Sequence, residues 1–154
     1  MADSVRESIS LPADRGAVWD LIMDPGRLAD WVDAHRQIED VPALPLAVGS
    51  RFRQQLGFGP VSFWVDWEVV EARRPELARW QGTGPGGSAA RIVYRLSVDG
   101  DETATRFDYE NAFDPPGGFV GAAATRVVNA AAGQREARKS MQRLRGLFED
   151  PTTR

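Results

Sequence analysis

The stretch from Gly117 to Glu149 is the longest segment of helical character in the chain. In its second half, Met141, Leu144 and Phe148 follow one another at intervals of three and four residues, which predicts a helix with one buried stripe. The first half is rich in alanine, and six small side chains would fill little space against the body of the protein. The pattern therefore predicts a long terminal helix with room for a ligand cavity beside its first half. Close packing of the alanines against the sheet is the alternative.

Before this helix, several segments alternate apolar and polar residues, as strands with one buried face do. They cover residues 5–11, 35–41, 51–58, 61–69, 78–80, 91–98 and 105–113. Asp14 is placed to cap a short helix after the first of them, and the turn Asp24-Pro25-Gly26 leads to a second. Short turns between the later strands make them antiparallel neighbours. We therefore expect an α+β fold, in which a curved antiparallel sheet of about seven strands wraps around the long C-terminal helix, with two short helices between strands one and two.

Composition narrows the classes of protein that fit. A chain of 154 residues suits one domain, which we expect to span residues 1–154. The chain has no cysteine and one histidine, so we expect no metal and no cofactor. A net charge of −3 argues against a nucleic-acid partner. Neither a signal peptide nor a membrane span is expected, because the first ten residues lack an apolar stretch and Arg126 interrupts the longest weakly polar run. The expected compartment is the cytoplasm.

Aromatic side chains fall on the inward faces of the predicted strands, and small side chains face them from the helix. Plain core packing is the alternative for each ring, but together the rings exceed what a helix of alanines can cover. This mismatch favours a cavity. The residues predicted to line it are Trp31, Phe63, Trp67, Trp80, Tyr94, Phe107, Tyr109, Asn111, Phe113, Val120, Ala124, Val127 and Ala131.

Four polar side chains fall on the apolar side of their strands, where each needs a partner or a wet cavity. They are Glu7, Gln54, Glu71 and Asn111. His35 is the one side chain whose ordinary pKa lies near neutral pH, so it is either a general acid/base, a ligand contact or a residue of the surface. Tyr94 would carry its hydroxyl into the cavity and could orient a ligand. The candidates for a catalytic role are His35, Asn111 and Tyr94.

Several short phrases, each loose alone, become specific in combination and order. They are Ser8-Ile9-Ser10-Leu11-Pro12-Ala13, Val18-Trp19-Asp20-Leu21-Ile22, Val48-Gly49-Ser50-Arg51-Phe52, Trp67-Glu68-Val69-Val70-Glu71 and Ser140-Met141-Gln142-Arg143-Leu144. In these phrases the chain resembles the START-like helix-grip superfamily (SRPBCC), in particular its polyketide cyclase/dehydrase-like branch. The resemblance covers roughly positions 4 to 149. It implies a hydrophobic cavity and does not imply a reaction.

The leading hypothesis is binding of a small hydrophobic or aromatic ligand, lipid or polyketide-like, in a cavity between the sheet and the C-terminal helix. One alternative is a cyclase or dehydratase acting on a polyketide-like substrate, with the catalytic candidates above polarising an enolisable carbonyl. Another is a regulatory or toxin-like interaction module without a ligand. The expected partner is a small hydrophobic molecule, and the expected state is a monomer or homodimer.

Overall fold

The computed structural model describes residues 3–114 and 133–149 of the chain. Their strands are β1 (Asp3–Leu11), β2 (His35–Glu39), β3 (Arg51–Phe58), β4 (Val61–Arg73), β5 (Leu77–Thr83), β6 (Ala89–Asp99) and β7 (Asp101–Asp114). Their helices are α1 (Arg15–Ile22), η1 (Pro25–Arg27), α2 (Leu28–Trp31), η2 (Pro85–Gly87) and α4 (Gly133–Glu149). The predicted fold class is confirmed, with two short α-helices between β1 and β2. The first part of the predicted terminal helix, residues 117–132, lies outside the described residues.

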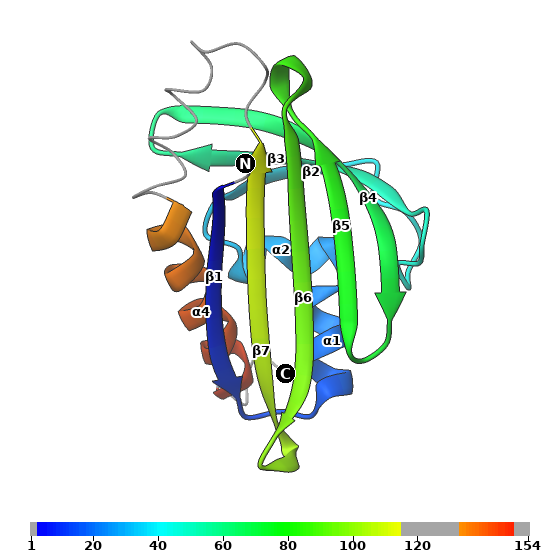
Figure 1. Cartoon of the computed structure of the whole chain (residues 1–154), viewed down its shortest axis with the longest axis vertical. Coiled ribbons are helices and arrows are strands. Elements are labelled where there is room, and N and C mark those ends of the chain that lie inside the picture. The colour runs from blue at the N-terminus through cyan, green and yellow to red at the C-terminus, as the bar shows by residue number, and fades with distance from the viewer. Residues whose placement is uncertain (1–2, 115–132, 150–154) are drawn as a thin grey trace.

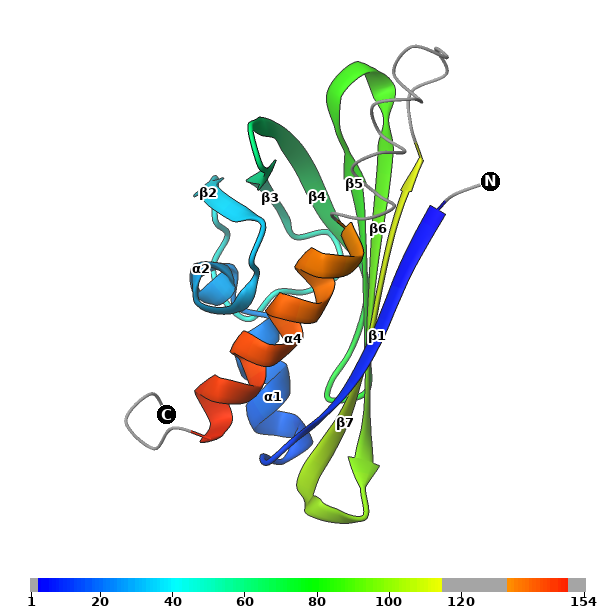
Figure 2. The ribbon, with the colours of Figure 1, turned by 90° about the vertical axis from the view of Figure 1, so that its left-hand side faces the viewer.

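In the described part of the chain, the seven strands form one antiparallel sheet in the order β1-β7-β6-β5-β4-β3-β2 (Figure 1). Strands β2 to β7 follow one another as a meander, and β1 pairs with β7 along its whole length. Figure 2 shows the sheet bending so that α1, α2 and α4 all lie on its concave side. Of these helices, α4 packs against β1, α2 against β2, and α1 against β6 and β7.

The predicted cap at Asp14 and the predicted turn at Asp24 are both present in the helical segment. The carboxylate of Asp14 accepts a hydrogen bond from the backbone N–H of Ala17 at 3.2 Å. The carboxylate of Asp24 accepts one from Gly26 at 2.9 Å and turns the chain into η1. These bonds satisfy backbone donors that a helix end leaves unpaired. The Asp14 bond sets the N-terminus of α1, and the Asp24 bond sets the N-terminus of η1, which leads directly into α2.

The buried stripe of α4 is where the sequence predicted it. Met141, Leu144 and Phe148 are all buried, together with Ala137 on the same face. The helix packs against β1 and α2. From α2, Trp31 reaches the sheet, where its ring centroid lies 6.0 Å from that of Tyr94. The helices and the sheet therefore share one aromatic core.

A β-bulge corrects one expectation. The register of β4 against β5 shifts between Val69 and Glu71, so that Glu71 pairs with Arg79 instead of continuing the inward phase of Val69. Glu71 binds the guanidinium of Arg79 at 2.8 Å and that of Arg73 at 3.0 Å. Its expected position on the apolar side is wrong, because an extra residue in one strand reverses the alternation beyond it.

No helix among the residues the structure describes has the length and apolarity needed to cross a membrane.

Candidate functional site

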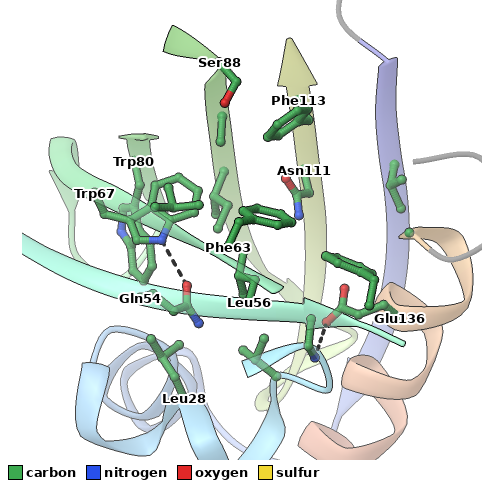
Figure 3. A pocket seen from close by; sticks show the side chains of 18 of the residues that line it. Leu28, Gln54, Leu56, Phe63, Trp67, Trp80, Ser88, Asn111, Phe113 and Glu136 are labelled. Atoms are coloured by element: carbon green, nitrogen blue, oxygen red, sulfur yellow. Dashed lines mark hydrogen bonds between the residues drawn. The ribbon is translucent and has the colours of Figure 1, made fainter. Parts of the chain in front are cut away.

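A cavity of about 320 Å³ lies on the concave side of the sheet, bounded by α2 and α4 (Figure 3). Most of the side chains around it are aliphatic or aromatic. The described residues that line it are Val5, Leu28, Val32, Ala34, Gln54, Leu56, Phe58, Val61, Phe63, Val65, Trp67, Trp80, Pro85, Ser88, Ala90, Ile92, Tyr94, Tyr109, Asn111, Phe113, Gly133 and Glu136. None of these is lysine or arginine, so the described wall carries no positive side chain.

The rings of the cavity wall are held by one another. The centroid of Trp80 lies 5.3 Å from Tyr94 and 5.9 Å from Trp67, with edge-to-face geometry that aromatic pairs prefer. Gly82 makes this packing possible, because a Cβ at Gly82 would stand 2.6 Å from Cγ1 of Val65 and 2.7 Å from the Trp67 ring. The absence of a side chain at Gly82 therefore leaves the space that Trp67 occupies.

The structure gathers most of the residues predicted to line the cavity. Those around it are Phe63, Trp67, Trp80, Tyr94, Tyr109, Asn111 and Phe113. Trp31 and Phe107 are fully buried next to Tyr94 and belong to the core beside the cavity, not to its wall. Val120, Ala124, Val127 and Ala131 lie outside the described residues.

His35 lies outside the cavity wall and contacts the lining residue Gln54. Nε2 of Gln54 lies 2.9 Å from Nδ1 of His35. Oε1 of Gln54 accepts a hydrogen bond from the indole of Trp67 at 2.9 Å (Figure 3). Burial and the neighbouring Arg36 cation lower the pKa of His35. The histidine can thus orient a cavity residue, and it does not line the cavity itself.

Glu136 brings a carboxyl group into this apolar wall from α4. Its Oε1 accepts hydrogen bonds from the hydroxyl of Ser140 at 2.6 Å and from the backbone N–H of Ala34 at 3.3 Å. Ser140 in turn accepts from the N–H of Asp33 at 2.9 Å. Burial raises the pKa of Glu136, and the Asp33 carboxylate adds to the shift, while the two hydrogen bonds and the Arg143 cation oppose it. This side chain can therefore hold a proton at a pH where an exposed glutamate would not.

Two tyrosines and an asparagine face the same region. Tyr94 and Tyr109 are register partners on β6 and β7, and their rings stack with centroids 6.0 Å apart. Burial raises the pKa of both hydroxyls, and Glu136 adds to the rise in each. The amide of Asn111 donates to the Tyr109 hydroxyl at 3.2 Å. Two of the catalytic candidates, Tyr94 and Asn111, are thus at the cavity.

Glu136 is not among the residues predicted from the sequence, although a signal for it is present there. Glu136 precedes Ser140 by four residues and Leu144 by eight, so it falls on the buried stripe of the helix. Its arginine-rich surroundings made that face look solvated. Among the described residues, no group of three or more histidine, aspartate or glutamate side chains is placed to hold a metal ion.

Comparison with known families gives one match over most of the chain. The model of a family described as polyketide cyclase / dehydrase and lipid transport matches residues 2–149. A comparison with curated proteins finds no match.

Solved structures of similar fold come from several bacteria. Protein CV1439 from Chromobacterium violaceum superposes with a TM-score of 0.74 at 14% identity, over 96% of this chain and 99% of that one. A conserved protein from Geobacillus kaustophilus gives 0.69 at 22%, over 95% of each chain. DynU16, a protein in the dynemicin biosynthetic locus, gives 0.64 at 20% over 96% of this chain, which spans 47% of DynU16. At these identities the likeness concerns the fold alone.

Proposed function

Because this chain belongs to the polyketide cyclase/dehydrase and lipid-transport family, we propose that it binds a small hydrophobic or aromatic ligand in the cavity between the sheet and α4. The observation that carries the proposal is the cavity wall, in which stacked and edge-to-face rings surround the space. The family description covers both polyketide-like molecules and lipids, and either class offers the apolar surface that this wall matches.

The size of the cavity supports the same conclusion. Its volume of about 320 Å³ is at the lower end of the range in which proteins bind small molecules. Apolar cavities of about half that volume, near 150 Å³, stay dry and take up benzene. A rigid molecule of one to three fused rings fits this space better than an extended lipid chain does.

Filling the cavity tests the proposal. Ala90 lines it from β6, whereas its neighbour Ala89 is exposed on the same strand, so Ala90→Phe and Ala89→Phe form a matched pair. We expect the parent and Ala89→Phe to bind an uncharged naphthalene probe with similar affinity, and Ala90→Phe to lose about tenfold or more. Equal binding by both variants, with unchanged melting temperatures, would contradict the proposal.

A second candidate function is catalysis of a cyclase or dehydratase type, and Glu136 is the observation that favours it. A buried carboxyl with a raised pKa, facing two tyrosine hydroxyls, has the features of a general acid in a dry pocket. Turnover of a polyketide-like ketone that disappears in Glu136→Gln, with ligand binding retained, would support it. Absence of turnover with every ketone that binds would leave ligand binding as the function.

A further inference from the structure

The polar groups of the cavity near α4 are arranged as donors. Asn111 donates to the oxygen of Tyr109, so the Tyr109 proton remains available to a third group. The neighbouring Tyr94 is its register partner, and the two rings are nearly parallel, with an interplanar angle of 28°. Both tyrosines line the cavity that Glu136 lines from α4, and the charge of Glu136 adds to the rise in the pKa of both hydroxyls.

Glu136 completes the arrangement from the other side. The hydrogen bonds from Ser140 and from Ala34 to its carboxyl both end on Oε1. Within the described part of the chain, Oε2 accepts no hydrogen bond, and Figure 3 shows the carboxyl reaching from α4 to the cavity wall. Since both donors occupy Oε1, a proton carried by this carboxyl belongs on Oε2, where it can be donated to a ligand.

We propose, resting on the proposed function, that this end of the cavity is a subsite for an uncharged carbonyl oxygen of the ligand, held by the carboxyl of Glu136 and the hydroxyl of Tyr109. The subsite makes the preferred ligand an apolar ketone or a similar neutral carbonyl compound. A ligand carboxylate fits poorly, because the described wall offers no lysine or arginine to pair with it. A purely hydrocarbon ligand leaves both donors without an acceptor.

The charges around Glu136 agree with a neutral carboxyl. Asp33, before β2, faces it and disfavours a second negative charge, whereas Arg143 on the same helix favours one. Tyr94 and Tyr109 approach from the sheet and stay uncharged, because burial raises the pKa of each hydroxyl. On β1, the carboxylate of Glu7 accepts a hydrogen bond from Gln134 and forms an ion pair with Arg138 at 3.8 Å. The negative charge of Glu7 is therefore paired with these two residues of α4. Burial is the largest influence and raises the pKa of Glu136.

Three naphthalenes of one shape test the subsite by equilibrium dialysis. They are 2-acetylnaphthalene, 2-ethylnaphthalene and 2-naphthoate, which present a ketone, an alkyl group and a carboxylate. The quantity measured is the ratio of affinities, ketone over alkyl, because it cancels general effects on the cavity. In Glu136→Leu we expect this ratio to fall about tenfold, and in Tyr109→Phe about fivefold. Glu136→Gln, which keeps an uncharged donor, should stay close to the parent. Glu149→Leu, on the exposed side of the same helix, is the matched control.

The pH dependence of the affinity ratio is a second test of the subsite, and it does not require an apolar residue at position 136. The ketone-over-alkyl ratio of the parent should fall as pH rises through the raised pKa of Glu136, while that of Glu136→Gln stays constant. Two results would overturn the subsite: a ratio that Glu136→Leu or high pH leaves unchanged, or tighter binding of naphthoate than of the ketone. In either case, continued binding of the neutral probes leaves the proposed function intact. Failure of all three probes to bind the folded parent would instead overturn the proposed function and the subsite with it.

Discussion

The amide of Gln54 fixes which nitrogen of His35 can carry a proton. Oε1 of Gln54 accepts from the Trp67 indole, which can only donate, so Nε2 of Gln54 must be the atom that faces Nδ1 of His35 at 2.9 Å. Because Nε2 donates, Nδ1 must accept. The neutral imidazole protonated on its other nitrogen satisfies this contact, and the imidazolium does not.

Acidification should therefore destabilise the protein through His35. Its pKa in the folded state is lowered by burial and by Arg36, so its contribution to stability is present above the ordinary value of 6.5 and is lost as pH falls through the lowered pKa. We expect the melting temperature of the parent to drop more between pH 7.5 and pH 5 than that of His35→Gln, which does not titrate. The same slope in both proteins would show that the Gln54 contact does not depend on the charge of His35.

Trp80 should be one of the most costly residues to truncate. It is 1% exposed, its ring is edge-on to Phe52 at 5.2 Å, and it packs against Trp67 and Tyr94. Trp80→Ala should lower the free energy of unfolding by about 3–5 kcal/mol, toward the lower value because part of the ring borders the cavity. Urea denaturation measures this loss.

Trp64 provides the comparison on the same sheet. It is only partly buried, and the guanidinium of Arg53 lies over its ring at 4.9 Å, so Trp64→Ala should cost about 1 kcal/mol or less. A loss at Trp80 that is no greater than the loss at Trp64 would mean that the inward and outward phases of these strands are exchanged.

The strand phases show how far alternation alone reaches. Trp67, Trp80 and Tyr109 were assigned to the inner face from the period of two, and all three line the cavity. The same count failed at Glu71, because a bulge leaves no mark in the sequence where apolar residues continue on both sides of it. Strand alternation therefore predicts which face of the sheet a residue occupies, up to the point where a bulge shifts the register between two strands.

Glu136, which brings the carboxyl group to the site, was not predicted for a different reason. Glu136 is surrounded in sequence by charged residues, and its burial depends on a backbone N–H of Ala34 and on the distant cavity wall. Such contacts join segments about a hundred residues apart, and a helical pattern contains no information about them. The hydrogen bond between Gln54 and His35 escaped prediction in the same way, since only the pairing of β2 with β3 brings the two side chains together.

Glu136 should make stability depend on pH in the opposite sense to His35. Because burial raises its pKa above the ordinary 4.5, its contribution is fully present below that value and is lost as pH rises through the raised pKa. The melting temperature of Glu136→Gln minus that of the parent should therefore increase from pH 4.5 to pH 8. Glu149→Gln, at an exposed position of α4, should show no such trend. A constant difference for Glu136→Gln would mean that the carboxyl is ionised throughout this range.

Two glycines should respond to alanine with opposite signs. At Gly82, the new methyl group would stand 2.6 Å from Cγ1 of Val65 and 2.7 Å from Cε3 of Trp67, which is too close for either to stay in place. Overpacking of this kind costs about 1–3 kcal/mol. The Trp67 ring must move, so its hydrogen bond to Gln54 should weaken and uptake of naphthalene probes should decrease.

Gly146 lies on an exposed turn of α4. Apart from its chain neighbours and the nearby helix backbone, no atom of the described residues lies within 4 Å of the position that a Cβ would take. Alanine is the better helix former by about 0.8–1 kcal/mol, so Gly146→Ala should stabilise the protein by up to that amount and leave probe binding unchanged. Urea denaturation and probe titration of both variants provide the measurement. A neutral Gly82→Ala with full probe binding would show that Trp67 has space to yield on the cavity side, and that its ring is held there by Gln54 and Trp80 without help from the gap at Gly82.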